Sequence, residues 1–585
     1  MGAFFIYNNK KLNIQPALEL FNEMGFAAPR SFEFGEWVIY AYPKMETIYS
    51  NIVSDNEYTL IANGTPIYKG LNYIDSLKKL LQDYQSARID TKRLIGHYTI
   101  LICYGKSIKI LSDPLGCKHL FIDKEHNIVS SHMLPICLSI DSKLHINRKS
   151  FYEKFLTGII MPPNTIFDEI IQIDKSITDC ITSEGKGIEF IHLSDFYFSK
   201  PRKKAFRKCL EEQSDTLRNY FESLTDAGKD GIDVGLSGGY DSRLVLACLY
   251  QYNKQKLHIH SHATEHVHNS EVKIAKQMAN YVGVPCHTVA TKKLSQCDNI
   301  NEILRKSVLY FDGRSSFSIG GCGEVYTASY RKESTEYTPF TLTGVGGELY
   351  RNVFDIGFRN IRFNRFMENK VFSQNFRKAI SEILYREVRD SIISRAASRL
   401  EICQSKKMPK TIAHRYYCEI MMPDGQGVAL DAYNQVSCCL APFLEPEIIK
   451  KGYEAIPYHH SGGDFEGKLI HFIDSGLAAI PSSYGYPIEK RPVRARIKER
   501  LRTYIPVSIW HKLATIFKGK GSFCIDSALS ELYANSQTMK DAYAFMTELF
   551  PEIDFTYLLQ SNEEIRMIQF EAMTLYFLKE RIKVN

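Results

Sequence analysis

In the first third of the chain, short runs of hydrophobic residues alternate with short polar segments. Up to about residue 191, apolar runs such as "EWVIYAYP" and "YTILICYGKSIKILSD" are separated by glycine, asparagine and charged residues, and helix-like stretches are few. Runs of this length bounded by turn residues are typical of β-strands. The pattern predicts an N-terminal domain rich in antiparallel sheet.

The pattern changes after a charged, proline-containing stretch, "SDFYFSKPRKKAF". The strand-like "GIDVGL" leads to a helix-like run from about Ser242, and "KLHIHSHA", "CHTVA" and "FTLTGVGG" then alternate with "SEVKIAKQMANYVG" and "INEILRKSVLYF". Strands and helices that alternate at this spacing predict a doubly wound parallel sheet. Beyond about residue 360 the pattern predicts mainly helices.

The turn "LSGGYDSRL" between the first strand and helix of this sheet carries candidate chemistry. Gly238 and Gly239 let backbone N–H groups approach phosphate oxygens, Ser237 and Ser242 add hydroxyl donors, and a helix N-terminus favours an anion. Asp241 beside phosphates needs a cation, for which Mg²⁺ is the default. The alternative is a strand-to-helix turn that binds no ligand.

This turn resembles the PP-loop of ATP pyrophosphatases, which cleave ATP between its α- and β-phosphates. The chain as a whole resembles the asparagine synthetase superfamily, which includes β-lactam synthetases and lasso-peptide macrolactam cyclases. Three further segments carry the resemblance in the family's order: 94–122 ("LIGHYTILICYGKSIKILSDPLGCKHLFI"), 341–350 ("TLTGVGGELY") and 431–457. The last is similar to the family's helical segment carrying "PFLD" and has "PFLE" here, so we expect it to be helical.

The resemblance implies a two-domain α/β protein. Residues 1–193 would form a degenerate class II glutamine amidotransferase-like domain, an α+β sandwich of the Ntn-hydrolase type. Residues 194–208 would be a linker. Residues 209–585 would form the PP-loop synthetase domain, a doubly wound parallel sheet with extra helices.

The resemblance also implies the roles of individual residues. In this family a carboxylate is adenylated by ATP, pyrophosphate leaves, and an amine attacks the acyl-AMP to give an amide. The loop Ser237 to Ser242 would hold pyrophosphate, and Asp241 and Glu348 would hold Mg²⁺. The residues expected around the adenosine are Leu236, Thr264, Thr343 and Gly344.

Departures from the family pattern refine the expected reaction. Glutamine-dependent members carry a nucleophilic cysteine directly after the initiator methionine, whereas this sequence has Gly2 there, and glycine has no side chain to attack an amide. Ammonia from glutamine is therefore excluded by this route, and an amine within the substrate becomes the expected nucleophile. Val345 stands where relatives carry a glutamate or tyrosine, and the acid pair is reduced to Glu348 followed by Leu349.

The family also uses a late lysine to stabilise the acyl-adenylate. The most similar segment, "FKGKGSF", makes Lys520 the first candidate and Lys518 the second, with Lys490 in "PIEKRP" the third. The alternative for each is a surface lysine in a solvated loop.

Three other patterns have a functional and a structural interpretation. His258, His260 and His262 alternate as on one face of a strand, which is compatible with a metal site but favours packing or substrate contact. The basic run 489–502 favours a solvated helix face over a nucleic-acid or acidic-peptide site, because it lacks interleaved aromatic residues. Asp312 and Arg314 are weak candidates for substrate contact.

Composition narrows the class of protein. The formal net charge of +7 is small for 585 residues, and the fourteen cysteines show no CxxC pair, so neither a disulfide framework nor a zinc site is expected. No secretory signal and no run of about 20 apolar residues is seen, so we expect a cytoplasmic protein without a membrane or nucleic-acid partner.

The sequence thus predicts an ATP- and Mg²⁺-dependent, AMP-forming amide-bond synthetase without glutaminase activity. Its substrate would be a small-molecule or peptide carboxylate. A macrolactam cyclase would also require a precursor peptide and a partner protease. The alternatives are amidation of a carboxylate with free ammonia, another PP-loop reaction such as tRNA base modification, and a degenerate homologue without activity.

Overall fold

The structure is a computed structural model that describes most of the chain. The described residues are 2–8, 12–45, 49–55, 57–174, 188–192, 198, 204–263, 269–290, 299–315, 330–334, 338–356, 361–404, 407–460, 462–495, 497, 536–559 and 565–583.

Two sheets form the N-terminal part. The six-stranded sheet has the order β12-β10-β11-β1-β3-β2, with bounds β1 Ala3–Tyr7, β2 Arg30–Phe34, β3 Trp37–Tyr42, β10 Phe121–Asp123, β11 Ile128–Ser130 and β12 Ile170–Gln172. The five-stranded sheet has the order β13-β9-β8-β5-β4, with bounds β4 Ile52–Ser54, β5 Tyr58–Gly64, β8 Tyr98–Tyr104, β9 Ser107–Ser112 and β13 Ile188–His192. The pairings are antiparallel apart from β13 with β9, which confirms the predicted antiparallel texture. The Ntn-hydrolase assignment stays a prediction.

The alternation of side chains along β1 explains why the two sheets pack face to face. Phe4 and Ile6 point into an apolar layer shared with β8 and β9, whereas Phe5 points to the opposite face. There its ring packs against that of Phe21 in α1 (Gln15–Met24), with centroids 6.3 Å apart. A strand whose two faces are both buried needs apolar residues at successive positions, as in "AFFIY".

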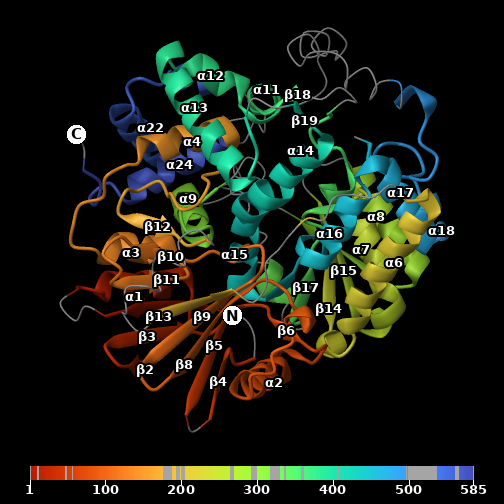
Figure 1. Cartoon of the computed structure of the whole chain (residues 1–585), viewed down its shortest axis with the longest axis horizontal. Coiled ribbons are helices and arrows are strands. Elements are labelled where there is room, and N and C mark those ends of the chain that lie inside the picture. The colour runs from red at the N-terminus through yellow and green to blue at the C-terminus, as the bar shows by residue number, and fades with distance from the viewer. Residues whose placement is uncertain are drawn as a thin grey trace.

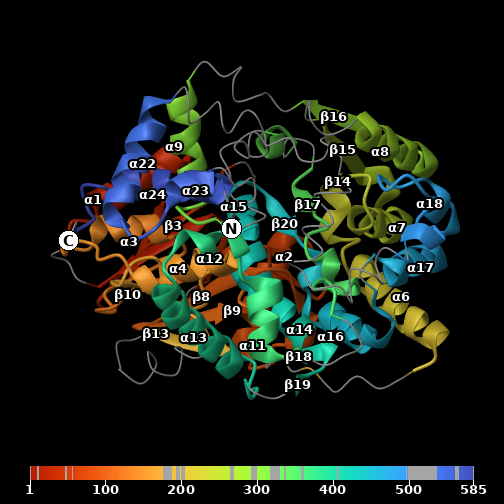
Figure 2. The same cartoon turned by 90° about the horizontal axis from the view of Figure 1, so that it is seen from above.

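A parallel sheet lies beside the sandwich that the two N-terminal sheets form (Figure 1). Its order is β16-β15-β14-β17-β20, with bounds β14 Ile232–Gly235, β15 Leu257–Ala263, β16 Cys286–Ala290, β17 Phe340–Leu342 and β20 Cys438–Leu440. All four pairings are parallel, which confirms the predicted parallel sheet. Helices α7 (Asp241–Asn253) and α8 (Asn269–Val282) lie with α17 (Asp464–Ile473) and α18 (Ser475–Ala479) on one side of it, away from α15 (Gly427–Val436) (Figure 2).

Strand β20 differs from the expectation that residues 431–457 are a helical segment. Cys438, Cys439 and Leu440 pair with Phe340, Thr341 and Leu342 of β17 and are buried. Three apolar residues are too few to show a period, and helical patterns flank them on both sides. The strand is therefore set by tertiary pairing, which the sequence pattern does not reveal.

Helices dominate after residue 360 in the described part of the chain, as predicted. The main ones are α13 Glu382–Arg399, α14 Lys410–Tyr416, the π-helix η7 Tyr417–Gln426, α15, α16 Pro446–Glu454, α17, α18, α22 Gln537–Leu549 and α24 Ile565–Phe577. Besides β20, the described strands in this part are a short antiparallel pair, β18 (Ile361–Arg362) with β19 (Lys407–Met408). None of the described helices is both long and apolar enough to cross a membrane.

A buried ion network joins the sandwich to the helices. Asp431 of α15 accepts hydrogen bonds from Lys118 Nζ at 2.6 Å and Arg314 Nη2 at 2.8 Å, and its Oδ2 lies 2.7 Å from His119 Nδ1. Burial alone would raise the pKa of Asp431, but the three surrounding bases hold it below its ordinary value. An ionised Asp431 therefore fixes the two parts to each other.

Candidate active site

The loop after β14 curls around two serine hydroxyls. Ser237 N donates to Ser242 Oγ at 3.2 Å, and Gly239 N donates to Ser237 Oγ at 3.2 Å. Ser237 is exposed, and α7 begins at Asp241 without a side-chain cap. The uncapped N–H groups at the start of a helix favour an anion, and the assignment of phosphate oxygens to this loop stays a prediction.

A second glycine loop touches the first. Because β17 runs parallel to β14 as its neighbour, both loops leave the same edge of the sheet. A Cβ on Gly347 would lie 2.3 Å from Asp241 Oδ1, and one on Gly344 would lie 2.9 Å from Ser242 N. Only glycine fits at these two contacts, which seat the Asp241 carboxylate on the backbone next to Glu348.

One guanidinium group bridges two carboxylates at this junction. Arg351, just after the short helix η5 (Gly347–Tyr350), places Nη2 2.5 Å from Asp241 Oδ1 and 2.8 Å from Glu466 Oε2 in α17. Glu466 is 0% exposed, and its Oε1 has no hydrogen-bond partner among the described residues. Burial raises the pKa of Glu466, and Arg351 opposes that shift.

Glu348 completes a group of three carboxylates around Arg351. Tyr417 of η7 donates its hydroxyl to Glu348 Oε2 at 2.9 Å, and burial, followed by Glu348, raises the pKa of Tyr417. Carboxylate oxygens are the ligands that Mg²⁺ prefers, and Asp241 is 27% exposed and hence accessible to an ion. The residues present fit the predicted metal, and the assignment of Asp241 and Glu348 stays a prediction.

A small pocket opens beside Glu348 and Arg351. It is lined by Arg351, Asn352, Val353, Phe354, Lys410, Ala413, His414, Tyr417, Ile456 and His459. His459 is buried, neither of its ring nitrogens has a hydrogen-bond partner in the described part of the chain, and burial lowers its pKa well below the usual value. A buried neutral imidazole with unused nitrogens is suited to a polar ligand group.

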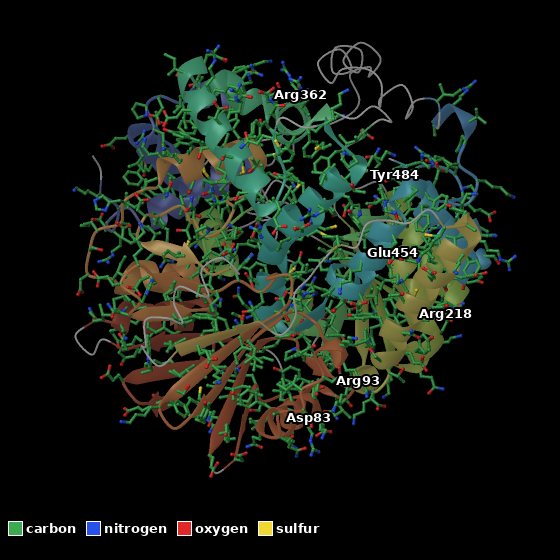
Figure 3. All side chains as sticks on the ribbon, in the orientation of Figure 1. Asp83, Arg93, Arg218, Arg362, Glu454 and Tyr484 are labelled. Atoms are coloured by element: carbon green, nitrogen blue, oxygen red, sulfur yellow. The ribbon has the colours of Figure 1, made fainter. Side chains whose placement is uncertain are left out.

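Residues after α18 cover the outer side of the loop Ser237 to Ser242. Ser483 N donates to the Gly238 carbonyl at 3.0 Å, and the ring of Tyr484 lies 5.8 Å from that of Tyr240. Tyr484 is 58% exposed and lies in the same part of the view as α17 (Figure 3). A Cβ on Gly238 would come within 2.9 Å of Ser483 Cβ, so the glycine also makes room for this cover.

Of the remaining predicted residues, two lie at the ends of strands, one lies on the surface and three lie outside the described part of the chain. Leu236 N donates to His260 O at 2.8 Å, and Thr343 Oγ1 accepts from Val345 N at 3.3 Å, so both follow directly on their strands. Lys490 is 82% exposed, with Glu489 at 3.7 Å. The others, Thr264, Lys518 and Lys520, lie outside the described residues.

The histidine-rich strand is packed rather than arranged for a metal, in the part of β15 that the structure describes. His260 Nδ1 lies 2.9 Å from Asp233 Oδ1. Burial lowers the pKa of His262 to about 4. Asp312 accepts from Met133 N and Leu134 N at the start of α3 (Met133–Ser139), so it caps a helix of the sandwich. Its neighbour Arg314 belongs to the Asp431 network.

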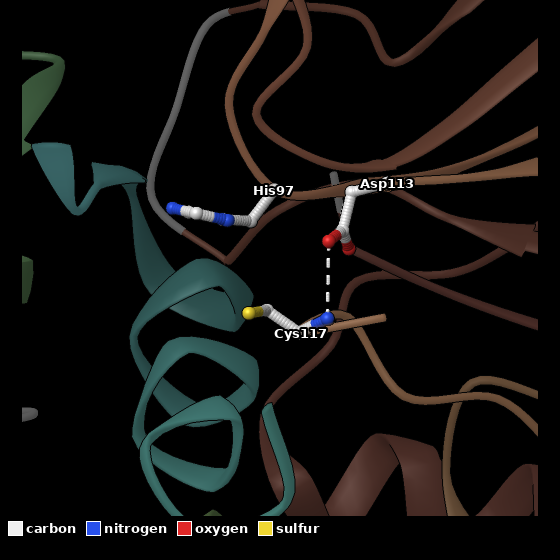
Figure 4. Close-up of side chains that lie close together, drawn as sticks. All are labelled: His97, Asp113 and Cys117. Atoms are coloured by element: carbon white, nitrogen blue, oxygen red, sulfur yellow. Dashed lines mark hydrogen bonds between the residues drawn. The ribbon is translucent and has the colours of Figure 1, made fainter. Parts of the chain in front are cut away.

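One described cluster has the donor types of a metal site: His97, Asp113 and Cys117 (Figure 4). The three ligand atoms lie within 4.8 Å of one another. However, Asp113 already accepts backbone hydrogen bonds from Leu115, Cys117 and Lys118, and His97 Nε2 faces the Ala441 carbonyl at 3.3 Å. The carboxylate braces a loop, so we assign the cluster to packing.

Sequence reasoning missed three residues at the junction: Arg351, Glu466 and Tyr417. Arg351 lies only three positions after Glu348, so its proximity could have been inferred from the motif. Glu466 and Tyr417 come from distant helical segments, and nothing in their local sequence signals that they reach this site.

Comparison with known proteins gives one match in sequence. Residues 232–318 match the model of the family described as asparagine synthase. No curated protein matches the chain.

Three solved structures are similar only in part. A U34-tRNA thiolase from Methanococcus maripaludis with its 4Fe-4S cluster is 13% identical, with 54% of this chain and 84% of that chain covered and a TM-score of 0.21. An NMN synthetase from Francisella tularensis is 11% identical, with 36% and 94% covered and a TM-score of 0.19. A glutamine-dependent NAD+ synthetase from Acinetobacter baumannii in complex with ADP is 15% identical, with 65% and 72% covered and a TM-score of 0.20. Similarity this weak carries no argument. The residues that match the asparagine synthase model include β14, the loop Ser237 to Ser242 and α7.

Proposed function

We propose that the chain is an ATP-dependent, AMP-forming amide-bond synthetase that adenylates a carboxylate and joins it to an amine. The observation that carries this proposal is the contact between the loop Ser237 to Ser242 and the second glycine loop, which brings the Asp241 carboxylate against Gly347, the residue before Glu348. The asparagine synthase match over 232–318 supports it independently.

The proposed division of labour follows from the geometry. The hydroxyls of Ser237 and Ser242, the loop N–H groups and the start of α7 hold pyrophosphate oxygens. Leu236, Thr343 and Gly344 border the adenosine. Asp241 and Glu348 hold Mg²⁺, which when bound offsets the charge of the departing pyrophosphate.

The nitrogen comes from an amine of the substrate, in this proposal, and not from glutamine. Gly2 has a φ of +91°, and a Cβ there would lie 1.9 Å from the Tyr42 carbonyl oxygen. Position 2 therefore has no space for a nucleophilic side chain. An intramolecular amine would make the enzyme a macrolactam cyclase, acting on a precursor peptide released by a partner protease.

Leu349 is weak support for an inactive homologue. Its side chain is buried and fills the space next to Gly452, where a Cβ would lie 2.6 Å from Leu349 Cγ. An acid at this position would be buried in the core and not directed toward Asp241. The loss of the second acid is therefore compatible with activity.

Carboxylate-dependent exchange of labelled pyrophosphate into ATP tests the proposal. The purified full chain is incubated with ATP, Mg²⁺ and a panel of amino acids, sugar acids and peptides. Exchange that requires both a carboxylate and Mg²⁺ is the expected result. Absence of nucleotide binding by the folded chain would exclude the function.

A further inference from the structure

Arg351 links two helices that are far apart in the sequence. Its Nη2 contacts Asp241, the first residue of α7, and Glu466 of α17. The guanidinium carbon also lies 5.6 Å from the centre of the Tyr240 ring. Through Asp241, the Arg351 side chain therefore contacts the loop Ser237 to Ser242 directly.

The two carboxylates hold Arg351 unequally. Glu466 Oε2 accepts from both Nε at 3.0 Å and Nη2 at 2.8 Å, and it is fully buried. Asp241 accepts from Nη2 alone and is partly exposed. A buried carboxylate needs its cation more than an exposed one does, so Glu466 is the anchor and Asp241 is the partner that can be released.

The contact with Asp241 conflicts with metal binding at the same oxygen. Asp241 Oδ1 is 2.5 Å from Arg351 Nη2, and a divalent ion bound there would lie close to the guanidinium charge. Like charges at a few ångström repel strongly in a partly buried site. Arg351 must therefore leave Oδ1 for a metal to bind that oxygen.

Arg351 has donors to spare for another anion. A guanidinium presents five N–H groups in a planar fork, which suits phosphate oxygens. Nε and Nη2 are occupied, whereas Nη1 has no hydrogen-bond partner within the described residues. The released end of the side chain can therefore donate to an anion in the loop.

We propose that Arg351 is a mobile counter-charge of the pyrophosphate site: it pairs with Asp241 in the free chain and, anchored on Glu466, turns to pyrophosphate when metal takes Asp241. This inference rests on the proposed function, because it requires the loop Ser237 to Ser242 to hold pyrophosphate. It makes Arg351 a phosphate-binding residue that also restrains metal binding before the nucleotide arrives.

Two titrations without turnover test this role in the full chain. Mn²⁺ binding is followed by electron paramagnetic resonance, and inorganic pyrophosphate binding in saturating Mn²⁺ by calorimetry. We expect Arg351→Gln to tighten Mn²⁺ about tenfold, because Asp241 is freed, and to weaken pyrophosphate about tenfold, because a charged donor is lost. Arg389→Gln, which removes an arginine that pairs with Glu368 and Asp390, is the control and should change neither.

Leaving Glu466 charged and unpaired could unfold Arg351→Gln, so the pair Arg351→Gln/Glu466→Gln, which removes both charges, is measured alongside. Opposite shifts of the two affinities in either folded variant support the proposal. Unchanged or weaker Mn²⁺ binding, or unchanged pyrophosphate binding, overturns it. Opposite shifts in a chain that never exchanges pyrophosphate into ATP would instead contradict the proposed synthetase and leave the role of Arg351 in place.

Discussion

Glycines at the beginning of β1 and after the end of β14 have opposite surroundings. At Gly2 a Cβ would meet three backbone atoms, the nearest, Tyr42 O, at 1.9 Å. At Gly239, apart from its chain neighbours, the only atom of the described residues within 4 Å of a Cβ would be Ser237 Oγ, at 3.2 Å. Glycine is thus found in crowded surroundings at position 2 and in open surroundings at position 239.

This difference separates structural glycines from functional ones. Gly2 lets the chain pass close to Tyr42 and Pro43, so its lack of a side chain serves packing. Gly239 leaves space just before the start of α7, where an anion is favoured. We therefore expect chemistry at the end of β14 and none at the start of β1.

The largest effect should come from the charge at the open site. Asp241→Asn should lower pyrophosphate exchange at least about 100-fold, because the predicted metal loses a charged ligand. The exchange assay at saturating ATP measures this loss. Asp226→Asn, at an exposed aspartate in the same sheet region, should keep full activity. Equal activity in both variants would show that Asp241 does not hold the metal.

The contact between the two loops can be broken by one methyl group. Gly347→Ala places a Cβ 2.3 Å from Asp241 Oδ1, so it should displace that carboxylate and lower exchange about tenfold or more. Gly425→Ala is the matched control, because its Cβ would meet only Ile159 Cγ2 at 3.4 Å. A Gly347→Ala enzyme with normal kinetics would argue against the geometry of the junction.

The closed site is tested by restoring the missing nucleophile. Gly2→Cys should yield no ammonia from glutamine and should lower the free energy of unfolding by about 2 kcal/mol, because a side chain collides with Tyr42 O at a positive φ. Glutaminase assays and urea unfolding measure the two effects. Gly105→Ala, also at positive φ but with open space, isolates the backbone cost. Ammonia release by a stable Gly2→Cys chain would contradict the conclusion that position 2 has no space for a nucleophile.

A pH-dependent effect is expected at the joint between the two regions. Glu445 Oε1 accepts from Gly96 N at 2.8 Å, and burial raises the pKa of Glu445 to about 8 from an ordinary 4.5. The folded state then binds more protons than the unfolded state between these pH values. Stability should fall as pH rises through this window, by up to about 1.4 kcal/mol per pH unit.

Urea unfolding from pH 5 to pH 8 measures this dependence. Glu445→Gln keeps an acceptor for Gly96 N but cannot ionise, so its stability should depend less on pH than that of the wild type. Parallel curves for the two proteins would mean that Glu445 titrates near its ordinary pKa.

Local pattern was sufficient for elements with their own period or motif. The strand, turn and helix around Ser237 to Ser242 follow from "GIDVGLSGGYDSRL", and the structure places β14 at Ile232–Gly235 and α7 at Asp241–Asn253. The neighbouring β17 was predicted from "FTLTGVGG". The parallel order then brings both loops to one edge, as expected for such sheets.

Features made by distant segments were not predictable in this way. Strand β20 has three residues, and its pairing with β17 decides its state. Glu466 lies on α17 more than a hundred residues from Arg351, and its burial gives no local signal. Long-range electrostatic contacts depend on the whole fold, and a single sequence does not encode them as a pattern.

The ion pairs of Asp431 limit how the sandwich can be separated from the rest of the chain. Two of the three bases around Asp431, Lys118 and His119, come from the sandwich, and the third, Arg314, comes from the part of the chain after it. In a fragment that starts after the sandwich, Asp431 would lose Lys118 and His119 and keep one of these three counter-charges, Arg314. The N-terminal sheets thus supply charges that α15 needs, and exchanging them between proteins would require the charge balance at Asp431 to be exchanged as well.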